Sequence, residues 1–177
     1  TVMENIDTDL FSPTLVRIDV DRWWVDVEGK PSIDQADFTY FDAFGEKNKF
    51  DAIFIMVHGI PGEDGILQKY FENLGLPFTT GPSNSVTGTF NKFKTTSRLR
   101  NAGFRVGNSI LISSSDNIDS MKLESIISEV GLPCFVKPNQ GGSSLGISRV
   151  DNPNELEPAI ISARDTECDS IIIESLL

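Results

Sequence analysis

The segment that decides the fold of the C-terminal half reads Cys134-Phe-Val-Lys-Pro-Asn-Gln-Gly-Gly-Ser-Ser-Leu-Gly-Ile-Ser-Arg-Val150. An apolar run on each side of a glycine- and serine-rich turn predicts two β-strands joined by a hairpin. Lys137 lies where the first apolar run ends, so its ammonium group is expected beside the turn. The lysine and the turn are therefore the first candidates for a ligand site.

The turn over residues 141–146 has the composition of a phosphate-binding loop. Its three glycines allow the backbone to bend and direct N–H groups inward, and Ser143 and Ser144 add two hydroxyl donors. A point cation beside such donors is what a polyphosphate requires. A plain β-hairpin with a surface lysine is the alternative that the residues leave open. The glycines also predict that residues 139–145 are mobile when no nucleotide is bound.

Two better-known motifs do not fit this segment. In the P-loop, G-x-x-x-x-G-K-[ST], the lysine follows the glycines and a helix comes next, whereas Lys137 precedes them. Residues 142–146 match the hydrolase motif G-x-S-x-G, with Ser144 as the nucleophile. That motif requires a following helix and a later histidine, but a strand is expected here and the only histidine, His58, lies upstream. Both classes are therefore excluded.

Composition narrows the class of protein. The 177 residues carry a formal net charge of −11, which argues against nucleic acid or an anionic membrane as the main partner but allows a nucleotide in a local basic pocket. No apolar run approaches the ~18 residues of a membrane span, so a cytoplasmic location is expected. Cys134 and Cys168 lack metal-ligand spacing and are expected to be buried, reduced thiols.

The N-terminal half has the pattern of an open α/β sheet. Residues 14–20 and 23–27 predict a hairpin, and the apolar run 52–57 predicts an inner strand of a parallel sheet, covered on both faces. A helix over 66–74 is expected to end at a glycine. Because ligands bind beyond the carboxyl ends of such strands, His58 is a candidate site residue. A histidine satisfied by the backbone is the alternative.

The C-terminal half predicts alternating helices and strands. A helix over 89–102 carries Lys92 near its start, where a merely solvated lysine is the alternative interpretation. Asn152 and Glu155 have the spacing of a capping box ahead of a later helix. The remaining predicted elements are a helix over 120–130 and a final strand over 170–174.

Four motifs occur in a fixed order along the chain. They are His58-Gly-Ile-Pro-Gly-Glu-Asp-Gly65 with Gln68, Asn91-Lys92, Lys137-Pro138 with Gly142-Ser-Ser-Leu-Gly146, and Ile172-Ile-Glu174. From about residue 51 to the last residue, their order and spacing resemble those of the D-alanine–D-alanine ligases of the ATP-grasp superfamily. The resemblance implies an open parallel-sheet, Rossmann-like α/β domain over 1–87, followed by the small α+β ATP-grasp nucleotide-binding subdomain over 88–177.

The resemblance also implies an activity. Members of this family phosphorylate the carboxylate of one D-alanine with ATP, and the amine of a second D-alanine then displaces phosphate, in peptidoglycan precursor synthesis. ATP and Mg²⁺ are the implied cofactors, with the magnesium ligands expected beyond residue 177 and none in this chain. D-alanine and ATP are the implied partners, and the full-length enzyme is expected to be a homodimer.

The family's site residues carry over by motif. Lys92 and Lys137 are expected at the ATP phosphates, with Lys137 also near the adenine, and Glu174 is expected at the adenine amino group or the ribose. The catalytic candidates are His58, near the first D-alanine, and Ser144, on the substrate side. The remaining candidates are Gly142, Ser143 and Ser144 in a lid over the phosphates, and Leu176 and Leu177 along the base pocket.

The chain departs from the family at both ends. The first strand with its G-G-x-S-x-E-type motif and everything beyond the strand at Glu174 are not represented. The chain is therefore expected to correspond to the first half to two-thirds of such an enzyme and to be inactive alone. Two alternatives remain: another ATP-grasp carboxylate–amine ligase, of the D-alanine–D-lactate or D-alanine–D-serine type, or a non-catalytic nucleotide-binding module that ends at Leu177.

Overall fold

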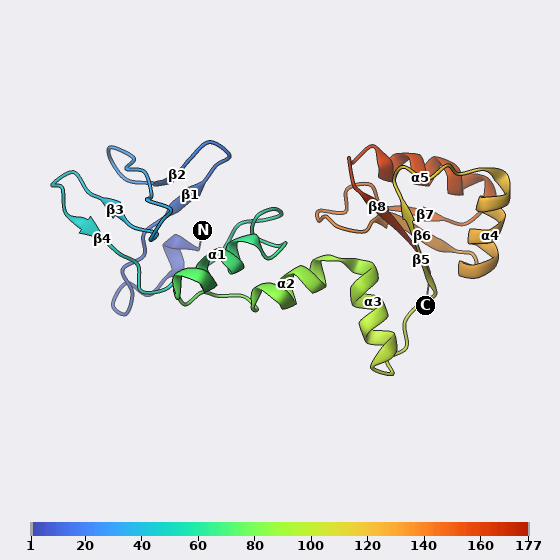
Figure 1. Ribbon diagram of the computed structural model, residues 1–177, viewed down its shortest axis with the longest axis horizontal. Helices are drawn as coiled ribbons and strands as arrows, with labels where there is room; N and C mark the ends of the chain where they lie inside the picture. The colour runs from blue at the N-terminus through green and yellow to red at the C-terminus, as the bar shows by residue number, and fades with distance from the viewer. Residues whose placement is uncertain (1, 177) are drawn as a thin grey trace.

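The computed structural model describes residues 2–176 and has two lobes connected by helices (Figure 1). The N-terminal lobe contains η1 (Met3–Asn5), β1 (Val16–Ile18), β2 (Trp23–Val25), β3 (Tyr40–Phe41), β4 (Lys47–Asn48) and α1 (Ile66–Leu74). The connection consists of α2 (Ser83–Phe90) and α3 (Lys92–Asn101). The C-terminal lobe contains β5 (Ser109–Ser113), α4 (Ser120–Val130), β6 (Cys134–Pro138), β7 (Ser148–Val150), η2 (Pro153–Glu155), α5 (Leu156–Arg164) and β8 (Ser170–Ser175).

The N-terminal lobe is built from two antiparallel hairpins and one helix. Val16 lies opposite Val25 in the β1–β2 ladder, which confirms the predicted hairpin. The core of this lobe combines aliphatic and aromatic side chains, and the ring of Phe38 meets that of Phe71 edge to face at 4.9 Å between centroids. Helix α1 ends as predicted at Gly75, whose φ of 67° is left-handed and therefore suits glycine.

The prediction that residues 52–57 form an inner strand covered on both faces was wrong. Only one parallel bridge forms there, between Ile53 and Phe78. The side chains of Phe54 and Met56 are 59% and 54% exposed, whereas Ile53, Ile55 and Val57 pack against the core. Among the residues that the structure describes, this segment is therefore packed against other side chains on one face only. A continuous apolar run does not by itself distinguish these two arrangements.

The predicted helix over 89–102 is divided into two helices. Asn91 leaves the helical region with φ −86° and ψ 104°, and its Oδ1 accepts a hydrogen bond from the Lys94 N–H at 2.9 Å. Asn91 thus ends α2 and caps α3, a role that asparagine commonly takes. The domain boundary predicted between residues 87 and 88 falls inside α2, and the division of the chain into two domains stays a proposal.

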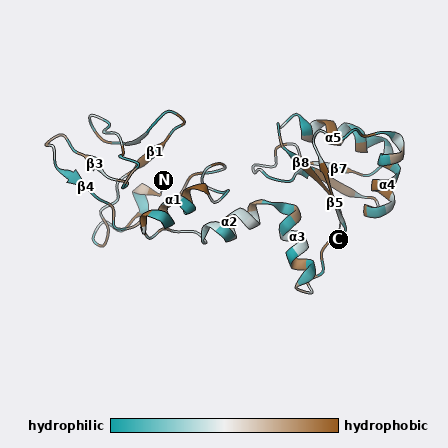
Figure 2. Ribbon diagram, in the orientation of Figure 1, coloured by the Kyte–Doolittle hydropathy of each residue, from teal (hydrophilic) through white to brown (hydrophobic). Residues whose placement is uncertain are grey.

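The C-terminal lobe is a four-stranded antiparallel sheet in the order β5-β8-β6-β7. Helices α4 and α5 pack against one face, and the shared core includes Ile126 from α4, Ile160 from α5 and Ile171 and Ile173 from β8. Figure 2 shows the hydrophobic residues along these strands. The predicted capping box of Asn152 and Glu155 is present and leads through η2 into α5. Because strand residues alternate between faces, β6 and β8 present a second set of side chains away from the helices.

The state of the two cysteines and the character of the helices bear on two predictions made from composition. Cys134 and Cys168 are both free thiols, as predicted, although only Cys134 is fully buried. Between residues 2 and 176, no helix has the length and apolar character needed to cross a membrane.

Candidate nucleotide-binding site

Lys137 and Glu174 lie on the sheet face opposite α4 and α5. In the antiparallel register of β6 and β8, Phe135 is opposite Glu174 and Lys137 is opposite Ile172, so these four side chains share one face. Lys137 Nζ donates a short hydrogen bond to Glu174 Oε1 and forms an ion pair with it. The two side chains are only 19% and 23% exposed, so the pair is partly shielded from water.

Lys92 lies beside this pair although it comes from a different element. It is the first residue of α3, and its Nζ donates to the carbonyl oxygen of Gly141 at 2.9 Å. Burial lowers the pKa of Lys92, and the positive charge of Lys137 lowers it further, while Glu174 acts in the opposite direction. The ammonium groups of Lys92 and Lys137 thus repel each other beside the Glu174 carboxylate. A bound polyanion would reduce that repulsion.

The glycine- and serine-rich loop follows β6 and leads into β7, as predicted. Ser143 and Ser144 have left-handed φ values of 54° and 56°, a conformation that costs energy for residues other than glycine. Gly146 also has a positive φ, of 68°, and a Cβ placed there would lie 2.6 Å from Thr166 Cγ2. The backbone is therefore bent sharply here, with Ser143 and Ser144 exposed at the surface.

The loop that carries His58 lies next to this glycine- and serine-rich loop. The His58 side chain is 92% exposed, and its Nδ1 is 3.5 Å from Glu63 Oε1. Glu63 Oε2 also accepts the N–H of Gly59 at 2.9 Å. A Cβ placed on Gly142 would lie 3.7 Å from the same Oε2. Glu63 thus belongs to the His58 loop and approaches the 141–146 loop at Gly142. His58 is an exposed histidine rather than one satisfied by backbone groups.

The structure brings most of the sequence-predicted residues into one region, from Glu174 through Lys137 and Lys92 to the 141–146 loop. Leu176 is half exposed, and its N–H donates to the carbonyl oxygen of Pro133 at 3.2 Å. Leu177, the other residue predicted along the base pocket, lies outside the described residues.

Sequence reasoning missed two residues of this region. Glu63 was part of a quoted motif, but its position between the loops gave no local signal. Asn139 was included in a segment predicted to be mobile, whereas it is 1% exposed and hydrogen-bonded to both α3 and β8. The predicted mobile segment can therefore start only after Asn139.

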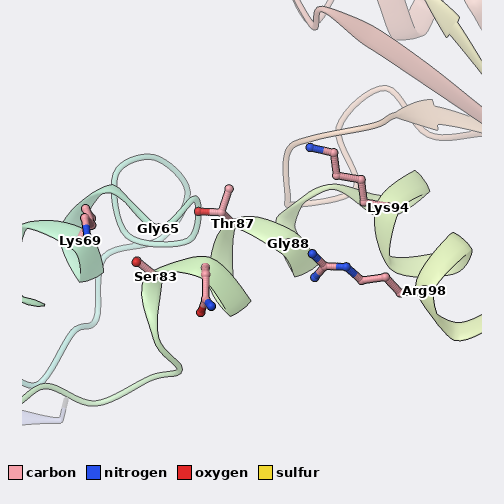
Figure 3. Close-up of a pocket in the computed structure, with 8 residues that line it drawn as sticks. Gly65, Lys69, Ser83, Thr87, Gly88, Lys94 and Arg98 are labelled. Atoms are coloured by element: carbon pink, nitrogen blue, oxygen red, sulfur yellow. The ribbon is translucent and has the colours of Figure 1, made fainter. Parts of the chain in front are cut away.

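A separate open hollow of about 380 Å³ lies at the junction of α1, α2 and α3 (Figure 3). Its charged groups are Lys69, Lys94 and Arg98, and hydroxyl groups of Ser83 and Thr87 face it. The carboxylate of Glu72 is 3.7 Å from Lys69 and accepts both the N–H and the hydroxyl of Ser83. None of the predicted site residues lines this hollow, so it is distinct from the Lys137 region.

Within residues 2–176, no three His, Cys, Asp or Glu side chains are grouped so that they could hold a metal ion. Lys92, Lys137 and the 141–146 loop can supply positive charge and backbone and hydroxyl donors.

Known proteins with similar sequences are D-alanine–D-alanine ligases. A family model described as "D-ala D-ala ligase C-terminus" matches residues 99–177. D-alanine–D-alanine ligases of Phocaeicola vulgatus and Flavobacterium johnsoniae are 38% and 39% identical over 174 and 178 residues, or 97% and 99% of this chain. Over nearly its whole length, the chain is similar to D-alanine–D-alanine ligases. It covers 52% and 54% of those two proteins, so it spans about half the length of the curated relatives that it matches.

Solved structures of D-alanine–D-alanine ligases confirm the predicted α/β class. The open parallel sheet predicted over 1–87 is not seen in residues 2–87, where the strands pair as two antiparallel hairpins and one parallel bridge joins Ile53 and Phe78. A D-alanine–D-alanine ligase of Coxiella burnetii matches with a TM-score of 0.82 at 22% identity, covering 99% of this chain and 57% of that chain. The VanG D-Ala:D-Ser ligase of Enterococcus faecalis matches with a TM-score of 0.81 at 25% identity, covering 99% and 56%. The described residues thus have the ATP-grasp architecture of this family.

Proposed function

We propose that the protein to which this chain belongs is an ATP-dependent ligase that joins two D-alanines, and that this chain supplies part of its nucleotide site. The observation that carries the proposal is the close placement of Lys92 and Lys137 beside the 141–146 loop. The relatives named D-alanine–D-alanine ligase support the substrate. Such a product serves peptidoglycan precursor synthesis in the cytoplasm.

The residues present fit the polyphosphate of ATP. Burial and the nearby charge of Lys137 lower the pKa of Lys92, and a loop rich in N–H and hydroxyl donors begins next to these two lysines. In the proposed site Lys92 and Lys137 neutralise phosphate charge, and Gly142, Ser143 and Ser144 cover the phosphates. Glu174 accepts from the adenosine, and the backbone at Leu176 and Leu177 borders the base.

His58 and Ser144 are proposed to act on the amino-acid side. His58 is exposed on a loop that Glu63 connects to Gly142, which suits a residue that approaches a substrate beside the phosphate site. ATP supplies the phosphoryl group that activates the carboxylate of the first D-alanine, and closure of the loop over that group excludes water. Mg²⁺ is proposed to be held by residues outside this chain.

The test is D-alanine-dependent release of phosphate from ATP by the full-length protein that contains this chain, with mass-spectrometric detection of the dipeptide. We expect phosphate and D-alanyl-D-alanine in equal amounts, with no phosphate released when D-alanine is omitted. Phosphate release without dipeptide, or no release at all, would contradict the proposal. A homodimer, and the absence of nucleic acid and membrane partners, are further expectations that sedimentation and binding assays can check.

A second substrate is favoured by one observation. The VanG match, with a TM-score of 0.81, is to a protein named D-Ala:D-Ser ligase, so the same architecture occurs with a different second amino acid. Supplying D-serine or D-lactate together with D-alanine in the same assay distinguishes the products by mass. A mixed product formed in preference to the D-alanine dipeptide would favour this alternative.

A further inference from the structure

Asn139 is a buried polar residue at the centre of the candidate site. It follows Pro138, the last residue of β6, and its exposed fraction is 1%. A buried amide is costly unless its hydrogen-bonding groups are satisfied. Its partners therefore indicate what the residue holds in place.

Four hydrogen bonds connect Asn139 to two other elements. Its carbonyl oxygen accepts the N–H of Lys92 at 3.0 Å, and its side-chain Oδ1 accepts the N–H of Phe93 at 2.9 Å. In the other direction, its N–H donates to the Ser170 carbonyl oxygen at 2.9 Å and its Nδ2 donates to Ser170 Oγ at 3.2 Å. One residue thus connects the end of β6 with the start of α3 and the start of β8.

The bonds to α3 satisfy groups that the helix cannot satisfy itself. The first N–H groups of an α-helix have no partner within the helix. Asn139 accepts those of Lys92 and Phe93, and Asn91 Oδ1 accepts that of Lys94 at 2.9 Å. The start of α3 is therefore fixed against β6 at the residue that carries the second lysine of the site.

We propose that Asn139 is a positioning residue that holds Lys92 beside Lys137 for nucleotide binding, an inference that rests on the function proposed above. Lys137 lies on β6, two residues before Asn139, while Lys92 is 47 positions from Asn139 in the chain and reaches this region only through α3. The two ammonium groups repel each other in the absence of a polyanion. The contacts of Asn139 oppose their separation.

The side-chain bonds can be removed without changing the charge. Asn139→Ala leaves the Phe93 N–H without its partner, so α3 should become less firmly docked and Lys92 should spend more time in solvent. Ile126→Val, in the core of the same lobe, is the matched control for a general loss of stability.

The experiment measures the dissociation constant of ATP by calorimetry and the KM of D-alanine for the full-length protein and these variants. We expect Asn139→Ala to weaken ATP binding about tenfold, the scale of a lost hydrogen bond that leaves a buried donor unpaired, with the D-alanine KM unchanged. Ile126→Val should remain within about twofold of the parent. Equal weakening in Asn139→Ala and Ile126→Val, or none in Asn139→Ala, would overturn the proposal.

Three further outcomes are also informative. If Asn139→Ala does not fold, Asn139→Ser replaces it, because a serine hydroxyl is too short to reach the Phe93 N–H, and parental ATP affinity in that variant would overturn the proposal. If the parent binds ATP but forms no dipeptide, the ligase proposal fails while the affinity comparison still decides the role of Asn139. If the parent does not bind ATP, both proposals fail.

Discussion

Lys137 and Glu174 lie diagonally across the neighbouring strands β6 and β8 and form an ion pair on the face that α4 and α5 leave uncovered. The antiparallel register places them two residues apart along the ladder, within reach of two long side chains. Their positions are therefore set by the backbone of the sheet. Without a ligand, the positive charge of Lys137 is paired with the carboxylate of Glu174, which is the group expected to contact the adenosine.

The first prediction concerns Lys137 itself. In the full-length protein, Lys137→Ala should weaken ATP binding by about 1–3 kcal/mol, the usual scale for a charge-assisted contact. Lys94→Ala is the matched control, because Lys94 is an exposed lysine of the same helix as Lys92 and lines the separate hollow. Calorimetry should show a loss in the first variant only. Unchanged affinity in Lys137→Ala would remove this lysine from the nucleotide site.

The second prediction concerns the pH dependence that Lys92 introduces. Burial and Lys137 lower the pKa of Lys92 below its ordinary value of 10.5. Between the lowered pKa and 10.5 the unfolded chain binds more protons than the folded one, so the free energy of unfolding should increase as pH rises through that window. ATP affinity should change in the opposite direction, because only the protonated lysine attracts phosphate.

Lys92→Met provides the measurement. Urea unfolding and ATP calorimetry, each carried out from neutral pH up to 10.5, should show a shallower pH dependence in this variant than in the parent. Both measurements are needed because the free energy of unfolding and the ATP affinity should change in opposite directions as pH rises. Identical pH profiles for the variant and the parent would show that Lys92 keeps its ordinary pKa.

Much of the fold could be predicted from local signals. The glycine that ends α1, the capping box at Asn152 and the two apolar runs around the 141–146 loop each act over a few residues, and the structure has all three. The half-exposed segment at Phe54 could not be predicted, because its burial depends on which elements pack against it. Strand β5 was not predicted from the sequence, although five of its residues pair with β8.

The residues of the site could be predicted from the sequence, but the contacts between them could not. Lys92, Lys137 and Glu174 occur in motifs, and the structure places them together. The hydrogen bonds of Asn139 join residues that are 46 and 31 positions apart, so no local pattern could indicate them. Glu63 and Gly142 likewise meet only because the two loops fold toward each other.

The third prediction concerns Tyr70 in the N-terminal lobe. Burial, with smaller contributions from Asp34 and Asp37, raises the pKa of Tyr70 to about 12, and its hydroxyl donates to the Gln35 carbonyl oxygen at 2.7 Å. The folded chain therefore keeps this proton between pH 10 and 12 while the unfolded chain releases it, so stability should decrease as pH rises through that window.

The variant Tyr70→Phe tests this effect. It should lose the alkaline slope and, at neutral pH, about 1 kcal/mol of the free energy of unfolding through the missing hydrogen bond. Ultraviolet titration should also lose one phenol that ionises near pH 12. A variant that keeps the parent's alkaline slope would assign it to other groups.

The fourth prediction compares two glycines with positive φ. Gly146 has a φ of 68° and would place a Cβ 2.6 Å from Thr166 Cγ2, whereas Gly103 has a φ of 86° with open space around it. Both alanine variants carry the backbone cost of about 1–2 kcal/mol, but only Gly146→Ala adds a steric clash. Urea unfolding should therefore show a clearly larger loss for Gly146→Ala. Equal losses would mean that the loop moves away from Thr166 at little cost.

The most direct test of carboxylate activation uses D-alanine labelled with ¹⁸O in its carboxylate, with ATP and Mg²⁺ and the full-length protein. If ATP phosphorylates the carboxylate and a second amine then displaces phosphate, one labelled oxygen leaves with each phosphate. Mass spectrometry of the released phosphate should therefore show one ¹⁸O per molecule, alongside dipeptide that has lost one label. Unlabelled phosphate, released while dipeptide forms, would contradict the account.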